Sequence, residues 1–107
     1  MLQAHARIPT DKASRYLAQL CKHFAHKVDV DWSDDRGQAD FGMGCCDLAV
    51  SGSELCLTCS SPTEDGLETV KRIVAGHFER FAWRDKLTVS WQAGAAATEM
   101  AAVKAAD

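Results

Sequence analysis

Three of the four histidines of this 107-residue sequence lie in two segments that have the pattern of amphipathic helices. His23 and His26 are three residues apart, a spacing that makes two side chains neighbours on a helix surface. His77 lies within the second segment. Because imidazole gains and loses a proton near neutral pH and also binds divalent metals, these three rings are the first candidates for chemistry.

The pair in the first segment has two interpretations. Two histidines at this spacing hold a divalent metal only if further ligands come from other parts of the chain. Alternatively, His26 forms a solvated cationic face with Lys22 and Lys27 near the helix C-terminus, where positive charge suits the helix dipole. The helical period places His23 at the edge of the apolar stripe and His26 nearly opposite its centre.

His77 is predicted on the apolar stripe of its helix, where a solvated residue would be unusual. It is either a core histidine with a hydrogen-bonded ring nitrogen or part of a binding site. We expect it to be mostly buried beside aromatic side chains and to be the most constrained histidine. In the functional interpretation, it shares a pocket with His23 and an arginine of the second segment. The predicted binding residues are His23, His26, Lys27, His77, Arg80 and Arg84.

A tight hairpin is predicted at Ser51-Gly-Ser-Glu54, with Gly52 and Ser53 as its turn. Residues on either side alternate between apolar and polar, as in a half-buried strand. In this register Cys46 faces Cys59, and both thiols point inward. The hairpin therefore places two cysteines in the core.

The five cysteines are an odd number, and we expect free thiols. Cys21 also points inward, from the stripe of the first helix. Together with Cys46, Cys59 and His77, it forms an alternative Cys₃His site for zinc or iron. Otherwise the three thiols behave as small buried apolar residues. Cys56 and Cys59 form a C-x-x-C spacing but point to opposite faces of a strand, so they cannot hold a metal together.

The elements that must position these residues follow from the hydrophobic periods. Thr10 is the expected N-cap of the first helix, and Ser61, Pro62 and Glu64 are expected at the N-cap, N1 and N3 of the second. We expect apolar helical stripes at residues 13–28 and 67–81, and strands at 2–8, 28–32, 38–41, 45–50, 55–60 and 86–91.

The order β-α-β-β-β-β-α-β, with one polar side on most strands, favours an antiparallel sheet with both helices packed on one face. The fold class is therefore α+β, a two-layer sandwich. Residues 1–92 are expected to form a single domain, and residues 93–107 an Ala-rich C-terminal tail.

The composition and the absence of several motifs exclude some classes of function. The net charge is −3 and no cluster of Lys and Arg is present, so nucleic acid is not an expected partner. The sequence has neither an 18-residue apolar run nor a secretory signal, which favours the cytoplasm and no membrane contact. It also lacks the motifs of nucleotide-binding loops and serine hydrolases, and no cofactor is predicted. The outward strand positions carry four aspartates, which form either a solvated face or an attractive surface for a cation or a basic partner.

Two strings resemble the bacterial domain of unknown function 2218 family. They are Arg15-Tyr-Leu-Ala-Gln-Leu-Cys-Lys-His-Phe-Ala-His-Lys27 and His77-Phe-Glu-Arg-Phe-Ala-Trp-Arg84. The similarity runs from about Leu2 to Gln92. The resemblance implies a small bacterial protein with no established catalytic residue. A similar domain is joined to siderophore-interacting flavoproteins in some relatives, which points toward iron.

These observations favour a non-enzymatic accessory domain that binds a ligand or a protein partner, with an association with iron or siderophore handling. The alternative is a small enzyme that uses His77 or His23 as a general acid or base. The identity of the ligand and the formation of a homo-oligomer are left open.

Overall fold

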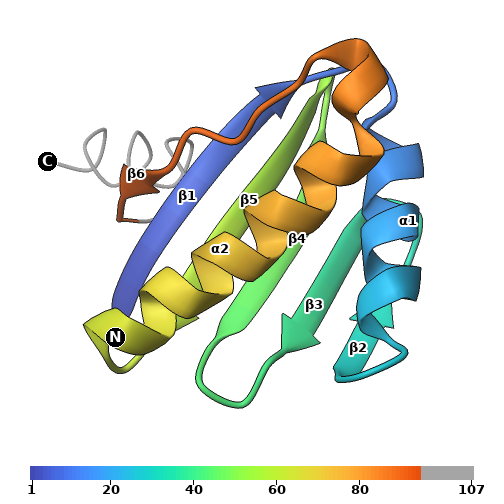
Figure 1. Cartoon of the computed structure of the whole chain (residues 1–107). Coiled ribbons are helices and arrows are strands. Elements are labelled where there is room, and N and C mark those ends of the chain that lie inside the picture. Colours follow the sequence, from blue (N-terminus) through green and yellow to red (C-terminus); the bar gives the residue numbers. More distant parts are fainter. Residues whose placement is uncertain (95–107) are drawn as a thin grey trace, which may run out of the picture.

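The computed structural model describes residues 1–94 and contains one six-stranded antiparallel sheet, in the order β2-β3-β4-β5-β1-β6. Both helices cover the same face of this sheet, and no helix of residues 1–94 lies on the opposite face (Figure 1). The predicted α+β class and element order are confirmed. No helix among residues 1–94 is long and apolar enough to span a membrane. The elements are β1 (Leu2–Pro9), α1 (Ala13–Phe24), β2 (Asp29–Trp32), β3 (Arg36–Asp40), β4 (Cys45–Ser51), β5 (Glu54–Ser61), α2 (Glu64–Phe81), the 3₁₀ turn η1 (Trp83–Asp85) and β6 (Gln92–Ala93).

The β4–β5 hairpin has the predicted register. Cys46 lies opposite Cys59, and Leu48 lies opposite Leu57. Gly52 has a φ of +59°, a conformation that an L side chain rarely adopts and that the tight turn requires. All four of these inward side chains are buried in the layer between the sheet and the helices.

Helix α1 buries the predicted stripe but ends earlier than predicted, at Phe24. His26 and Lys27 therefore lie in the turn that follows, because the chain has to leave the helix layer before β2 begins at Asp29. The predicted N-cap is also wrong. Lys12 occupies that position, and the hydroxyl of Thr10 accepts a hydrogen bond from the Lys12 backbone N–H just before the helix.

Helix α2 starts two residues later than predicted, with Thr63 rather than Ser61 as its N-cap. The Thr63 hydroxyl accepts a hydrogen bond of 3.0 Å from the Gly66 N–H. Ser61 is the last residue of β5, and its buried hydroxyl donates to the Met43 carbonyl oxygen. It is not available as a cap because the sheet and the β3–β4 loop already hold it.

The last strand was predicted at residues 86–91, but none of these residues forms a strand, and the short strand β6 lies just after them. Leu87, Val89 and Trp91 pack against the core as expected, but only Gln92 and Ala93 pair with β1. The Val89 N–H donates instead to a side-chain oxygen of Glu79 at 2.9 Å. The alternation of apolar and polar residues here therefore reflects burial of one side of an extended segment, not pairing with a neighbouring strand. Since Ala93 belongs to the sheet, the predicted tail starts too early, and its residues 95–107 lie outside the described part of the chain.

Two glycines of α2 differ in the space around them. A Cβ at Gly66 would collide with the Ser61 hydroxyl and lie 2.8 Å from the Met43 carbonyl oxygen, whereas a Cβ at Gly76 would meet no atom within 4 Å. Gly66 therefore allows the helix to pack closely on the β3–β4 loop, and Gly76 has no such role.

We expect Gly66→Ala to lower the free energy of unfolding by about 1–3 kcal/mol because the added methyl group overpacks this contact. The matched change Gly76→Ala should raise it by about 0.5–1 kcal/mol, since alanine loses less backbone entropy in a helix. Urea denaturation of both variants measures the difference. Equal effects of the two changes would show that α2 does not pack on the loop as described.

The cysteines should differ in reactivity. Cys21, Cys46 and Cys59 are buried, and burial raises the pKa of Cys21 to about 11. Cys45 and Cys56 are half-buried on the open face of the sheet, and burial also raises both of their pKa values. Arg7 counteracts the shift at Cys56, whereas Asp40 and Asp47 add to it at Cys45.

In the folded protein, we expect iodoacetamide to modify Cys56 first, then Cys45, and the three core thiols only after unfolding, because the thiolate is the reacting form. Peptide mass spectrometry after timed labelling gives the order. Labelling in concentrated guanidinium chloride serves as the control, in which all five cysteines should react at similar rates. Modification of Cys46 as fast as Cys56 in the native state would contradict the hairpin register.

Candidate functional site

A hollow of about 260 Å³ lies where the end of α1 meets α2 and the start of the β3–β4 loop. Three of its lining residues, His23, Lys27 and His77, were predicted as binding residues. The others are apolar, and none of the lining residues is acidic. The complete lining is His23, Phe24, Lys27, Val28, Phe41, Ile73 and His77.

The two imidazoles of the hollow contact each other across the helix pair in a tilted arrangement. Their ring centroids are 4.6 Å apart, with an angle of 47° between the ring planes. His77 Nδ1 lies 2.7 Å from the carbonyl oxygen of Ile73, one helical turn earlier. A carbonyl oxygen only accepts hydrogen bonds, so Nδ1 carries the hydrogen. In neutral His77, the lone pair is therefore on Nε2.

Aromatic side chains hold both rings in place. Phe24 packs edge-on against His77, with centroids 5.5 Å apart, and against Phe41 at 5.2 Å. Phe81 contacts His23 in the same way at 5.6 Å. These contacts limit the rotation of the imidazoles, so the hollow has preorganised polar groups on a mainly apolar wall. His77 is half-buried rather than mostly buried, and its predicted aromatic neighbours and hydrogen bond are present.

The electrostatic environment of the hollow is positive. His23 is exposed, but the partial loss of solvent around its ring lowers its pKa, and the charged forms of His77 and His26, together with Arg80 and Lys27, lower it further. Each of these groups disfavours a second positive charge on the ring. His23 therefore stays neutral near pH 7, and an anion placed in the hollow would favour its protonated form.

The other predicted site residues lie outside the hollow. His26 is exposed in the turn after α1, and Arg80 is exposed but close enough to influence His23. The Arg84 guanidinium lies 5.2 Å from the Trp83 ring centroid. Phe41 and Val28 line the hollow but were not predicted, since they come from a loop and a turn whose positions depend on the sheet. An aromatic residue directly before Gly42 was the only sequence signal for Phe41.

The alternative metal site is not assembled. Among residues 1–94, no group of three or more His, Cys, Asp or Glu side chains could hold a metal ion. The sulfur of Cys46 instead donates to the Asp47 carbonyl oxygen at 3.7 Å, and its interaction with Cys59, together with burial, raises the pKa of Cys46. The expectation that His77 is the most constrained histidine is also wrong. His5 is only 5% exposed, and its Nδ1 lies 3.0 Å from the Gly94 carbonyl oxygen.

The shift at His23 makes stability depend on pH. The unfolded chain binds the proton near pH 6.5, whereas folded His23 binds it only at lower pH. The neutral form of His23 is therefore fully compatible with the folded state above about pH 6.5. As the pH falls through the lowered pKa, protonation of the ring reduces the free energy of unfolding. NMR titration of the ring should give a value below 6.5.

Replacing His77 with Gln should raise the pKa of His23, because it removes a neighbouring cationic group. The control Arg72→Gln changes an exposed cation on the same helix that does not act on His23, and it should leave the titration unchanged. A His23 pKa at or above 6.5 in the parent protein would contradict the described surroundings of the ring.

Comparison with known proteins assigns the chain to a family. A model of uncharacterized proteins conserved in bacteria, DUF2218, matches residues 5–92. The NMR structure of PA4090 from Pseudomonas aeruginosa is 35% identical and superposes with a TM-score of 0.73, over 86% of this chain and 96% of that one. Curated proteins gave no significant match. The family match covers most of the domain, including both helices that line the hollow, and the chain belongs to the DUF2218 family.

Proposed function

We propose that this domain is a binding module whose hollow between α1 and α2 takes a small ligand with an apolar body and an anionic group. The observation that carries the proposal is the pairing of two imidazoles, 4.6 Å apart, on a mainly apolar wall without an acidic residue. Ligand sites in proteins generally combine apolar walls with a few fixed polar groups in this manner.

The apolar part of the ligand would contact Phe24, Phe41 and Ile73. Its anionic group would lie between the imidazoles and the ammonium group of Lys27. No acidic residue lines the hollow to neutralise these positively charged groups. Binding would favour protonation of His23 and turn it into a charged hydrogen-bond donor, and such bonds are stronger than neutral ones. A carboxylate is the simplest group that fits.

The size of the hollow limits the ligand. A volume of about 260 Å³ is below the roughly 300–1,000 Å³ of sites for drug-sized molecules. A small aromatic or branched aliphatic carboxylate is compatible with this volume. A ferric siderophore is larger, so the association with siderophore handling that the family resemblance suggested would have to involve a fragment of it or another surface.

One observation favours the second candidate, a small enzyme. The Nδ1–H of His77 is held by the Ile73 carbonyl oxygen, which leaves Nε2 as the proton acceptor of a neutral ring. A general base requires such an oriented lone pair. Mass spectrometry of the ligand after incubation separates the two candidates, since a binding module returns it unchanged.

We expect benzoate, salicylate and isovalerate to shift the NMR signals of His23, Phe24 and His77, and the strongest binder among them to raise the melting temperature. Binding should also raise the pKa of His23. His77→Phe should abolish these effects because it removes one imidazole and fills part of the hollow. The matched control is His26→Gln, which changes an exposed histidine outside the hollow and should bind as the parent does.

The corresponding uncharged amides test the charge requirement. If benzamide binds as tightly as benzoate, the anionic part of the proposal is wrong. If neither the acids nor the amides shift signals of the lining residues, the hollow is not a site for this ligand class and the proposal is overturned.

A further inference from the structure

An exposed tryptophan lies just beyond the C-terminal end of α2. Trp83 is 65% exposed, although tryptophan is usually among the more buried residues of a domain. The guanidinium carbon of Arg84 lies 5.2 Å from its ring centroid, within the range of a cation–π interaction. The indole is therefore presented to solvent with a cation over its face.

The turn that carries Trp83 is held on both sides. Before it, Ala82 is buried and its N–H donates to the Phe78 carbonyl oxygen at 2.9 Å. After it, the carboxylate of Asp85 accepts hydrogen bonds from the Tyr16 hydroxyl and from Lys12 Nζ. These anchors fix the direction of η1. The exposure of Trp83 thus arises from an ordered turn, and little conformational entropy would be lost on binding.

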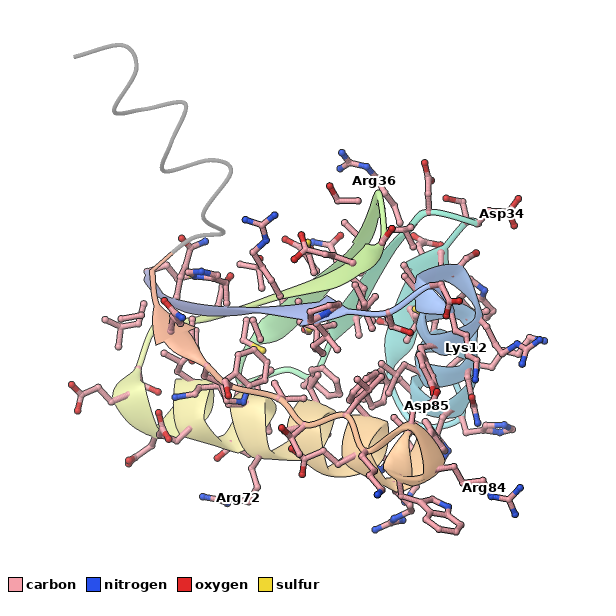
Figure 2. The ribbon with its side chains drawn as sticks, turned by 90° about the horizontal axis from the view of Figure 1, so that it is seen from above. Lys12, Asp34, Arg36, Arg72, Arg84 and Asp85 are labelled. Carbon is pink, nitrogen blue, oxygen red and sulfur yellow. The ribbon has the colours of Figure 1, made fainter. Side chains whose placement is uncertain are left out.

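The charge around Trp83 is positive and not neutralised. Within residues 1–94, neither Arg80 nor Arg84 forms an ion pair, while the nearby Asp85 is already paired with Lys12. Arg15 lies close enough to Asp85 to lower the pKa of its carboxyl group and adds to the positive potential. Figure 2 shows the Arg84 side chain extending away from the body of the molecule.

We propose that Trp83 and Arg84, named here the Trp83 surface, bind an acidic segment of a partner protein that also presents an apolar side chain. Tryptophan and arginine are the residues that contribute most often to the binding energy of protein interfaces. The indole would cover the apolar side chain, and the guanidinium group of Arg84 would pair with a carboxylate. The proposal is independent of the hollow, because neither of these two residues lines it.

The alternative occupant is a single-stranded nucleic acid, which could stack on the indole. The charge of the whole chain favours the protein segment. The net charge is −3, and the open face of the sheet carries Asp29, Asp31 and Asp40, which would repel a phosphate backbone that extends beyond the Trp83 surface. An acidic peptide that ends within the surface avoids this repulsion.

Selection of the full chain against a phage-displayed library of random peptides tests the proposal. We expect the enriched peptides to be acidic, to contain at least one large apolar residue and to shift the Trp83 indole N–H signal in NMR titrations. Trp83→Ala should weaken their binding at least 10-fold, and Arg84→Gln several-fold. Binding should also weaken with added salt, which screens exposed charges.

Arg72→Gln is the matched control, because it removes an exposed cation of α2 outside the Trp83 surface and should leave binding within twofold. Melting curves of all variants show that they are folded. Enrichment of neutral or basic peptides, or equal binding by Trp83→Ala, would overturn the proposal. So would tighter binding of oligo(dT) than of the selected peptides, which would assign the surface to nucleic acid. The His77→Phe variant should bind these peptides normally, so the result does not depend on the hollow.

Discussion

The register of the hairpin formed by β4 and β5 decides which side chains face the helices. Cys46 and Cys59 lie opposite each other at the centre of the sheet, and the neighbouring strands continue the same alternation through Ala39 and Ala4. Because side chains alternate with a period of two, a slip of one residue would turn this whole apolar set toward solvent. The turn at Gly52, whose positive φ suits a two-residue loop, fixes the register locally. In this register the apolar side chains lie on the inner face of the sheet, against which both helices pack.

The two helices are joined to each other at both ends of their contact. At one end, Tyr16 packs edge-on against Phe78 and donates a hydrogen bond to Asp85. Burial and this hydrogen bond raise the pKa of Tyr16 to about 12. At the other end, His23 lies against His77. The hollow forms at this second end because α1 stops at Phe24 and the chain turns away into β2. The proposed ligand site is thus a consequence of how the helix layer returns to the sheet.

Charge is distributed unevenly over the two layers. The C-terminal half of α2 and the turn η1 carry cations without ion-pair partners among residues 1–94, whereas paired positions on the open sheet face include Asp29 opposite Asp40. Like charges placed directly opposite each other destabilise a sheet slightly, so this arrangement has a cost that packing of the other face offsets. Both proposed binding surfaces lie in the cationic layer, and each would therefore select an anionic partner.

The sequence alone determined the element order, the one-sided sheet, the hairpin register and the inward cysteines, since these follow from local periodicity and turn residues. It also indicated His23 and His77 as a pair. Tertiary structure decided what local patterns could not separate. Ser61 matched the cap pattern in the sequence, but its hydroxyl donates to the Met43 carbonyl oxygen, and Thr63 caps the helix instead. The alternation at residues 87–91 matched a strand, but the Val89 N–H donates to Glu79 rather than to a neighbouring strand. The hollow itself depends on Phe41 and Val28, which are far from His77 in the sequence and contact the same hollow only when the sheet and the helices pack. The physical reason is that burial of a shared apolar core brings together residues that no local interaction connects.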